Sequence, residues 1–344
     1  MTRPLTVIAW PAFKTAAANP YQSLLYQAVA QNDVHVVECT LRALFTAPRG
    51  SVLHLHWPDA FIANASLPIA LLKLIALRIL ALWSVLRGVA WVWTAHNLHR
   101  PGQRHSTLMA WFFWPWFVKT LSGVLYLTHA SQAAVEAAYP HLKGVPNAVT
   151  PHGTYSVSET RMTQTNRTEL LFFGGVSRYK RVGDLVRAFG KLDRPDVHLR
   201  IAGARSGADP DPDVGTALDQ LAPPLRANVT VEDTYLSAEG LTYRVRAARI
   251  IVLPLVAVQN SGTALYALSC HRPILVPRLP AFEELSTQVG PGWVHMFDGT
   301  LTASDIEDTL DLLDKVPAGS PDLTCLAWPE IGALTASFFK EIAA

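Results

Sequence analysis

Residues 170–189, LLFFGGVSRYKRVGDLVRAF, decide the fold class of this 344-residue chain. The stretch begins with an apolar run typical of a buried strand, turns at Gly174 and Gly175, and continues into a predicted amphipathic helix. Strand, turn and helix in this order are typical of a parallel α/β unit. Glycines at a strand end let a ligand approach the backbone, and Arg178 and Lys180 could neutralise a diphosphate. The alternative is a tight turn with solvated basic residues.

A second stretch of the same kind is 250–277, IIVLPLVAVQNSGTALYALSCHRPILVP. A predicted strand leads into a loop with Asn260, and Ser261, Gly262 and Thr263 then open an apolar helix. The N-terminus of a helix exposes unpaired N–H groups and a partial positive charge, so an anion is expected there. The alternative is an ordinary capped core helix.

The alternation of strands and helices occurs twice along the chain, which predicts two Rossmann-like α/β domains with parallel sheets facing across a cleft. We expect domains at 1–155 and 156–327, joined by a polar linker at 156–168, and a helix at 328–344 that could pack on either. The expected strands are 5–10, 34–38, 51–56, 90–94, 124–128, 145–149, 169–173, 197–202, 229–232, 250–254 and 274–276. The expected helices begin near 20 and span 66–86, 132–139 (capped by Ser131), 182–192, 238–248 and 262–269.

Composition narrows the functional class. Half of the residues are hydrophobic, 16% are charged and the net charge is +2, so a folded core is expected and nucleic acid is not an expected partner. The three cysteines, Cys39, Cys270 and Cys325, lack the spacing of metal ligands and indicate a reducing compartment. The apolar run at the N-terminus is too short for a signal peptide, so export is not expected.

Charge is unevenly distributed along the first half. Between Asp59 and Glu136 there is no Asp or Glu, and six tryptophans fall there. The apolar helix expected at 66–86 contains Lys73 and Arg78, which would be costly in the centre of a bilayer. We therefore expect this helix to lie on a membrane surface, with aromatic residues at the level of the headgroups: Trp111, Trp114 and Trp116. The alternative is a core helix and an internal aromatic cluster.

The two stretches around 180 and 261 together resemble the second domain of GT-B glycosyltransferases of the large retaining type. Gly174 and Lys180 match the motif that holds the diphosphate in that family, whereas Gly175 stands where an arginine is usual, so Arg178 is expected to supply the charge. The family's two glutamates eight residues apart are replaced by Val258 and Tyr266.

Five further motifs resemble a narrower group, the bacterial β-mannosyltransferases of xanthan-type exopolysaccharide assembly: NPYQSLLY (19–26), HLHWPDAF (54–61), WTAHNLHRP (93–101), VTPHGTY (149–155) and QNSGTALYALS (259–269). This resemblance implies transfer of mannose from GDP-mannose to a polyprenyl-diphosphate-linked oligosaccharide, with inversion and without a metal or other cofactor. It also implies a monotopic, peripheral protein on the cytoplasmic face of the inner membrane. The first domain would bind the acceptor and face the membrane, and the second would bind the nucleotide sugar.

Inversion requires a base that deprotonates the acceptor hydroxyl. Asp59 is the first candidate, because it follows a strand in the middle of the first sheet, and His96 is the second. Asp59 could instead cap a helix, and His54 and His56 alternate on a strand and are expected to share one face. His152 could contact the phosphate or the sugar, or lie in an ordinary turn. Asn19 and Tyr21 are weaker candidates for acceptor binding.

Two rival functions remain open from the sequence. One is a retaining hexosyltransferase that uses a UDP-sugar. The other is a non-catalytic protein that binds a nucleotide or a sugar, which the missing glutamates favour.

Overall fold

The computed structural model describes residues 4–16, 19–63, 65–96, 105–157, 168–203, 210–234, 236–315 and 319–344. It divides the chain into two compact units, Met1–Gly153 with Cys325–Ala344, and Thr154–Thr324. The helix expected at 328–344 is α15 (Trp328–Ala343) and belongs to the first unit. Most of the expected linker, together with residues 97–101 of the motif at 93–101, lies outside the described residues.

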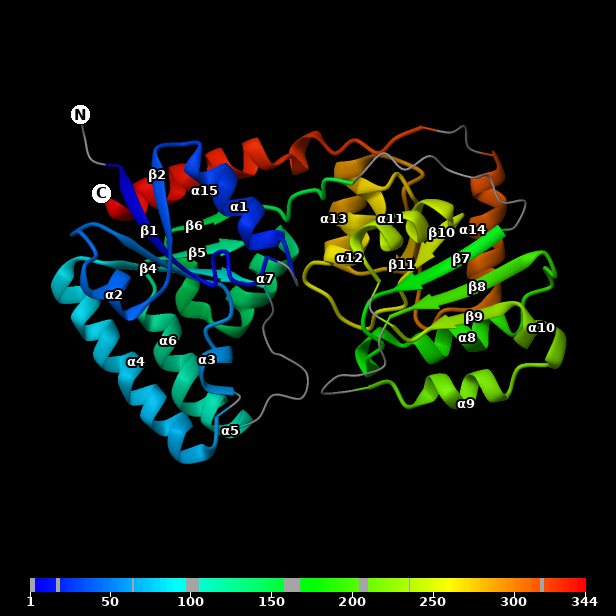
Figure 1. The fold of residues 1–344 in the computed structure, drawn as a ribbon, viewed down its shortest axis with the longest axis horizontal. Helices are drawn as coiled ribbons and strands as arrows, with labels where there is room; N and C mark the ends of the chain where they lie inside the picture. Colours follow the sequence, from blue (N-terminus) through cyan, green and yellow to red (C-terminus); the bar gives the residue numbers. More distant parts are fainter. Residues whose placement is uncertain are drawn as a thin grey trace. The chain divides into compact units, whose positions relative to one another are not determined.

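The first unit contains a six-stranded parallel sheet with the order β2-β1-β3-β4-β5-β6 (Figure 1). Its strands are β1 (Leu5–Trp10), β2 (Val34–Glu38), β3 (Val52–Leu55), β4 (Ala90–Ala95), β5 (Gly123–Tyr126) and β6 (Asn147–Val149). Successive side chains of a strand point to opposite faces, so each strand contributes side chains to two hydrophobic cores, one on each face of the sheet. One core lies under α1 and α15 and the other under α4 and α6, on the opposite face of the sheet.

The helices of the first unit connect these strands. They are α1 (Tyr21–Ala30), α2 (Leu41–Phe45), α3 (Ala60–Ala63), α4 (Leu67–Arg87), α5 (Ser106–Leu108), the π-helix η1 (Met109–Phe113), α6 (Trp114–Thr120), α7 (His129–Ala138), the 3-10 helices η2 (Pro140–Gly144) and η4 (Thr324–Leu326), which begins in the second unit, and α15.

The second unit contains another six-stranded parallel sheet, with the order β12-β11-β10-β7-β8-β9. Its strands are β7 (Thr168–Phe173), β8 (Val197–Ala202), β9 (Val229–Glu232), β10 (Ile250–Val252), β11 (Ile274–Pro277) and β12 (Val294–Phe297). Its helices are η3 (Arg178–Lys180), α8 (Val182–Phe189), α9 (Asp213–Asp219), α10 (Pro223–Ala227), α11 (Ala238–Ala247), α12 (Gly262–Ser269), α13 (Pro280–Val289) and α14 (Ala303–Lys315). The sheet order reverses between β7 and β10, which is where ligands bind in open parallel sheets.

Ser131 does not cap α7, so that expectation was wrong. The helix begins at His129, and the hydroxyl of Thr128 accepts a hydrogen bond from the Ser131 amide at 2.8 Å. Ser131 Oγ in turn accepts from the Thr128 amide at 3.1 Å, so the two residues form a capping box. Either hydroxyl residue fits the sequence pattern, and only the backbone angles decide which of them precedes the helix.

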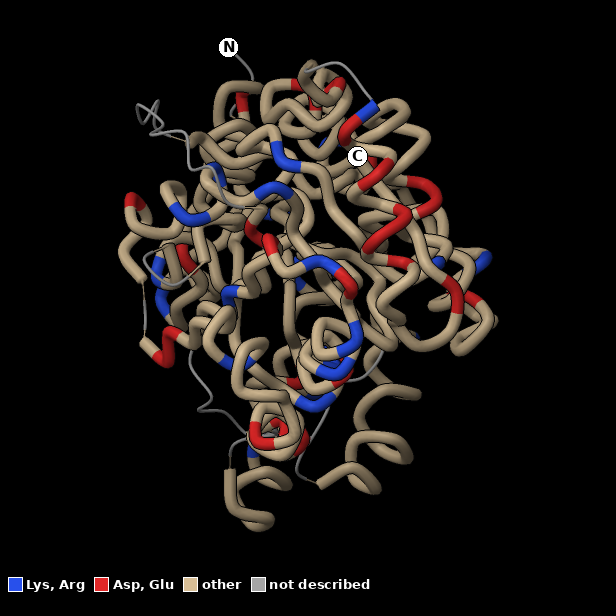
Figure 2. Tube along the Cα trace, turned by 90° about the vertical axis from the view of Figure 1, so that its right-hand side faces the viewer, with Lys and Arg blue, Asp and Glu red and all other residues tan. Residues whose placement is uncertain are grey.

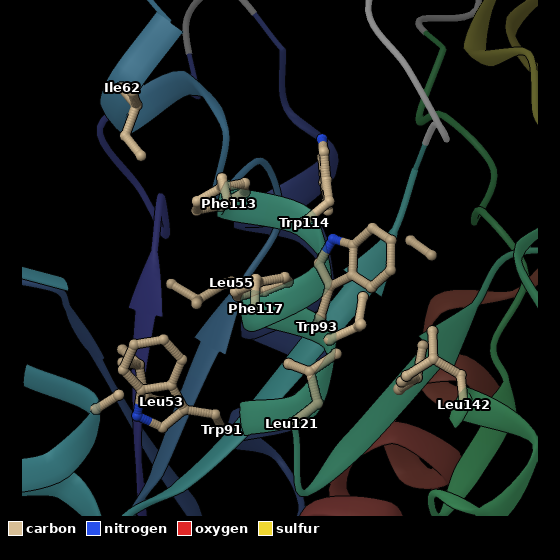
Figure 3. Close-up of a cluster of buried hydrophobic side chains, with 14 of the residues drawn as sticks. Leu53, Leu55, Ile62, Trp91, Trp93, Phe113, Trp114, Phe117, Leu121 and Leu142 are labelled. Carbon is tan, nitrogen blue, oxygen red and sulfur yellow. The ribbon is translucent and has the colours of Figure 1, made fainter. Parts of the chain in front are cut away.

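The aromatic run at 111–116 divides between surface and core. Trp114 is 3% exposed and packs against Trp93 and Phe117, with ring centroids 5.5 and 5.8 Å apart (Figure 3). Trp114 therefore cannot lie at a membrane surface, which corrects the expectation for that residue. Trp111 is 75% exposed, and Trp116 packs partly buried against the same core.

Helix α15 packs against α1 at a point where only glycine fits. A Cβ atom on Gly332 would lie 2.6 Å from the carbonyl carbon of Ala28 and 2.7 Å from its oxygen. Such distances are sterically forbidden, so any side chain at this position would push the two helices apart. The close contact ties the C-terminal helix to the first unit.

We therefore predict that Gly332→Ala destabilises the protein by about 1–3 kcal/mol, the usual cost of overpacking a close contact. The expected sign opposes the intrinsic preference of helices for alanine over glycine, about 1 kcal/mol. Denaturant unfolding measures the change. Gly144→Ala is the matched control, because a Cβ atom there meets no atom within 4 Å. Equal stability of the two variants would contradict the prediction.

Candidate functional site

The basic loop and the start of α12 meet at Gly174, at the carboxyl end of β7. A Cβ atom on Gly174 would lie 3.0 Å from Nζ of Lys180 and 3.8 Å from the hydroxyl oxygen of Thr263. The backbone of Gly174 has a φ of 107°, in the region that favours glycine. The motif lysine and the helix start, which are 83 residues apart in sequence, therefore border one point in the structure.

Lys180 carries a positive charge that no described acidic side chain neutralises. It is half-buried, and its Nζ has no hydrogen bond or ion pair with the residues that the structure describes. Nζ lies over the rings of Phe172 and Tyr179, 5.8 and 5.9 Å from their centroids. Burial lowers the pKa of Lys180 to about 8. A bound anion would offset this desolvation, because an opposite charge nearby favours the charged form of the lysine.

The first turn of α12 supplies further positive potential at the same point. Ser261 is its N-cap, and the Ser261 hydroxyl accepts a hydrogen bond from the amide of Ala264 at 3.2 Å. Gly262 and Thr263 are half-buried and form the first turn. Amides at a helix N-terminus together with a lysine are a common arrangement for holding a phosphate group.

The other expected diphosphate residues lie around this point in different settings. Gly175 is exposed, and a Cβ atom there would have nothing within 4 Å, so the position could hold a larger residue. Arg178 is exposed at the start of η3, two residues before Lys180. Asn260 is half-buried in the loop that precedes the N-cap Ser261.

Tyr266, which stands where the larger family has a glutamate, is anchored by its hydroxyl. Thr242 Oγ1 lies 2.8 Å from the Tyr266 hydroxyl and also donates a hydrogen bond to the carbonyl of Ala238 at 2.8 Å. The ring of Tyr266 contacts those of Phe173 and Tyr155, with centroids 5.8 and 5.3 Å apart. Residue 266 thus places a phenol beside the end of β7, where the family places a carboxylate.

The first unit contains a buried polar chain that the sequence analysis missed. The Tyr26 hydroxyl lies 2.7 Å from Nδ1 of His54 and 2.7 Å from Nε2 of His56. Nε2 of His54 lies 2.7 Å from Oγ1 of Thr94, and Nδ1 of His56 lies 2.8 Å from Nε2 of His96. His54 and His56 share one face of β3, as their alternation predicts. The sequence feature that could have indicated this chain is Tyr26, which lies on the buried face of α1, the helix expected to begin near residue 20.

Aromatic rings enclose the His96 end of this chain. Trp57 stacks on His96 with centroids 4.7 Å apart, and the ring of Tyr21 lies 5.3 Å from His96 and 4.5 Å from His152. His152 is buried, and its Nδ1 lies 2.8 Å from the carbonyl oxygen of Gly153. Burial lowers the pKa of His152 to about 4, so this imidazole is neutral at pH 7.

Asp59 and Asn19 lie in loops at the same edge of the first sheet. Asp59 is 4% exposed and directly precedes α3, and its carbonyl accepts a hydrogen bond from the Ile62 amide at 3.0 Å. Its position is therefore compatible with either of its expected roles, the base or the residue before a helix. Asn19 has a structural role, because its Oδ1 accepts from the amide of Tyr21 at 3.1 Å, where α1 begins.

Helix α4 presents an apolar stripe on the outside of the first unit. By length and composition this helix could cross a membrane, but Ala70, Leu74, Ala81 and Ser84 are buried against the unit. The opposite side exposes an apolar row at helical spacing: Leu72, Ile75, Ile79, Leu82 and Leu86. We call this row the α4 stripe.

The cations of α4 bind neighbouring carbonyl groups. Lys73 Nζ donates to the carbonyl of Phe61 at 2.9 Å, and Arg78 donates to that of Phe112 at 3.2 Å while its guanidinium lies over Trp116. Charged residues of both signs recur along the trace in Figure 2, yet residues 60–135 contain no Asp or Glu. The cations of α4 therefore have no acidic residue in the surrounding sequence.

Within the described ranges, no group of three or more His, Cys, Asp or Glu side chains is arranged to hold a metal ion. The cysteines among them, Cys39, Cys270 and Cys325, form no disulfide.

Comparison with known sequences gives the family. Residues 167–311 match the family model described as glycosyl transferases group 1. Over 336 residues, the chain is 30% identical to a GDP-mannose:glycolipid 4-beta-D-mannosyltransferase of Xanthomonas campestris pv. campestris, an alignment that covers 96% of this chain and 90% of the relative. A protein of the same name from another strain of that pathovar is 31% identical over the same length.

Solved structures share the fold. A sucrose-phosphate synthase from Thermosynechococcus elongatus has a TM-score of 0.60 and 14% identity, covering 99% of this chain and 94% of its own. An α,α-trehalose-phosphate synthase (UDP-forming) from Burkholderia vietnamiensis has a TM-score of 0.60 and 11% identity, covering 98% of both chains. The expected GT-B fold is confirmed, and the chain belongs to the GT-B glycosyltransferase family that includes the GDP-mannose:glycolipid 4-beta-D-mannosyltransferases.

Proposed function

We propose that this glycosyltransferase moves mannose from GDP-mannose to a lipid-linked oligosaccharide, with inversion at the anomeric carbon, in exopolysaccharide assembly. The observation that carries the proposal is the meeting of Lys180 and the start of α12 at Gly174, in a chain whose mannosyltransferase relative aligns over 96% of its length. A nucleoside diphosphate is the anion that this arrangement suits, because both groups favour closely spaced negative charge.

The leaving group is stabilised by the second unit. When the anomeric bond breaks, the diphosphate gains charge, and positive groups already in place lower the barrier. Lys180 and the first-turn amides of α12 provide this charge, with Arg178 as a further cation of the loop. Transfer therefore needs no metal ion or other cofactor.

Deprotonation of the acceptor hydroxyl is assigned to Asp59, which follows β3 at the carboxyl edge of the first sheet. A carboxylate that accepts this proton in the transition state contributes about 10²- to 10⁴-fold to the rate. His152 and Tyr21 lie beside His96 at that edge and suit contacts with sugar hydroxyls.

We assign membrane binding to the α4 stripe, which would hold the protein on the cytoplasmic face of the inner membrane. The stripe is apolar, Trp111 and Phe112 are exposed close to Arg78, and no acidic residue of the surrounding sequence would repel anionic lipids. Since the other side of α4 packs on the first unit, the helix would lie in the interface and not cross it. A polyprenyl-linked acceptor would be presented at the same surface.

The first test is the affinity for nucleotides. Isothermal titration should show binding of GDP and GDP-mannose, preferred over UDP and UDP-sugars, and unchanged by EDTA. Lys180→Ala should weaken GDP binding about 10- to 100-fold, because a hydrogen bond to a charged group contributes about 1.5–3 kcal/mol.

Lys191→Ala is the matched control for this loss, since Lys191 is an exposed lysine of the same unit. It should bind GDP as the unaltered protein does. If the unaltered protein bound none of GDP, UDP and their sugars, the proposed function would be wrong.

The affinity should also depend on pH through Lys180. The pKa of its ammonium is about 8 in the free protein, and a bound diphosphate raises it, so binding takes up a proton near this pH. GDP affinity should therefore fall as the pH rises above about 8, by up to about tenfold per pH unit. Isothermal titrations with GDP between pH 7 and 9.5 measure this change in affinity. Lys180→Arg keeps its charge and should lose this dependence; the same slope in both proteins would contradict the assignment.

Membrane binding is tested by co-sedimentation with liposomes that contain anionic lipid. The protein should sediment with them and be released by high salt or detergent. Ile79→Glu with Leu82→Glu places two charges on the α4 stripe and should abolish sedimentation, because each charge would have to enter the apolar layer. Leu334→Glu is the control, an exposed leucine on α15. An unaltered protein that stays in the supernatant would refute the membrane assignment.

The two rival functions predict different outcomes from the proposed function in binding and transfer experiments. A retaining hexosyltransferase would bind UDP-sugars in the titration and yield a product with retained anomeric configuration by NMR. A non-catalytic binding protein is favoured by Val258 and Tyr266 in place of the family's glutamates. It would bind nucleotide and transfer no sugar to any lipid-linked acceptor.

A further inference from the structure

The buried chain of the first unit consists of neutral groups. Tyr26, His54, His56 and Thr94 are at most 1% exposed, and His96 is 5% exposed. Burial lowers the pKa of His54 to about 3 and that of His56 well below its usual value, and it raises the pKa of the Tyr26 hydroxyl well above its usual value. At pH 7 each imidazole of the pair therefore carries one proton, on one of its two nitrogens.

This neutrality limits the chain to two hydrogen-bond arrangements. Every contact needs one hydrogen, and a neutral imidazole donates from one nitrogen and accepts at the other. The Tyr26 oxygen could also accept from both imidazoles, but the hydrogen of its own hydroxyl would then be buried without an acceptor, which is unfavourable. The hydrogens of the chain therefore all point the same way. In one arrangement they point from His96 toward Thr94, and in the other from Thr94 toward His96.

Thr94 decides between the two arrangements. Its Oγ1 contacts Nε2 of His54 at 2.7 Å and has no second hydrogen-bond partner among the described residues. If Thr94 accepted from His54, its own hydroxyl hydrogen would be buried without an acceptor, which is unfavourable. Thr94 therefore donates to His54, His54 donates from Nδ1 to the Tyr26 oxygen, and Tyr26 donates to Nε2 of His56.

The last step of the chain fixes His96. The remaining hydrogen of His56 is on Nδ1, so Nδ1 of His56 donates to Nε2 of His96. Because Nε2 of His96 accepts this hydrogen bond, it carries no proton, so the proton of His96 is on Nδ1. We propose that Thr94, His54, Tyr26 and His56 are positioning residues that lock His96 in the tautomer with its proton on Nδ1, so that His96 is a hydrogen-bond donor and not the catalytic base.

This proposal deepens the proposed function and rests on it, because it concerns which residue deprotonates the acceptor hydroxyl. It separates the two base candidates: His96 has no free lone pair in the locked form, because Nε2 already accepts from His56. Proton removal is then left to Asp59. Conversion of His96 into a base would require every hydrogen in the chain to reverse and the Thr94 hydroxyl to lose its acceptor.

Nitrogen NMR of protein labelled with 15N-histidine tests the lock without any turnover. At pH 7, His96 should show a protonated Nδ1 and an unprotonated Nε2, with its signals assigned by their loss in His96→Asn. Tyr26→Phe removes the link between His54 and His56 and should replace the single tautomer of His96 by a mixture. Tyr126→Phe is the control, since Tyr126 is a buried tyrosine whose hydroxyl has no partner among the described residues, and it should leave the signals unchanged.

Kinetics test the role of His96. Asparagine places an amide N–H close to the position of Nδ1–H but cannot act as a base, so His96→Asn should keep kcat/KM within about tenfold, and His96→Ala should lose more. Asp59→Asn should lose about 10²- to 10⁴-fold, the usual contribution of a general base.

Two results would contradict the proposed tautomer and role of His96. One is an NMR spectrum in which Nδ1 of His96 is unprotonated. The other is a His96→Asn variant that is as inactive as Asp59→Asn and also loses the acidic limb of the pH profile of kcat/KM. A Tyr26→Phe variant with an unchanged His96 tautomer would equally exclude control through the chain. If the unaltered protein transferred no sugar, the proposed function would fail, and the NMR experiment would still decide the tautomer.

Discussion

The ammonium group of Lys180 is the constraint on which the chemistry of the second unit depends. It is partly removed from water, and no carboxylate among the described residues neutralises it. The amides at the start of α12 add positive potential at the same point beside Gly174. A positive charge that is partly removed from water is unfavourable while no anion is bound, and a bound anion stabilises it. The loop and the helix are therefore suited to a diphosphate, whose negative charge increases when it leaves the sugar.

The buried polar chain at the carboxyl edge of the first sheet has a different electrostatic character. Its members are neutral, and their hydrogen bonds run continuously from Thr94 through Tyr26 to His96. A chain of this kind resists ionisation, because a charge on any buried member would be desolvated. In the proposed mechanism, proton transfer at this edge falls to Asp59, while the imidazoles orient hydrogen bonds.

The alternation of side chains along β3 links this edge to the face of the unit that carries the α4 stripe. His54 and His56 point toward α1 and α15, while Leu53 and Leu55 point toward the core under α4. The same strand therefore positions the polar chain on one side and supports the helix with the α4 stripe on the other. With the proposed membrane binding through the α4 stripe, the polar chain would lie on the other face of the sheet, away from the lipid.

Much of the fold follows from local sequence. The strands at 5–10, 34–38, 197–202 and 229–232 and the helix at 262–269 lie at their predicted bounds, because hydrophobic periodicity and turn residues act over a few neighbouring positions. The sequence also identified the two segments that border Gly174. It did not assign β12, whose four residues include His295 and carry little periodicity, and it placed Trp114 at the surface.

The sequence by itself therefore determined the two α/β units and the two segments that border Gly174, whose signals lie in contiguous residues. Only the tertiary structure decided that α15 belongs to the first unit, that Trp114 is in the core, and that Tyr26 joins two histidines 28 and 30 residues away. Those outcomes depend on contacts between distant segments. Packing geometry sets such contacts, and no periodicity of a single segment encodes them.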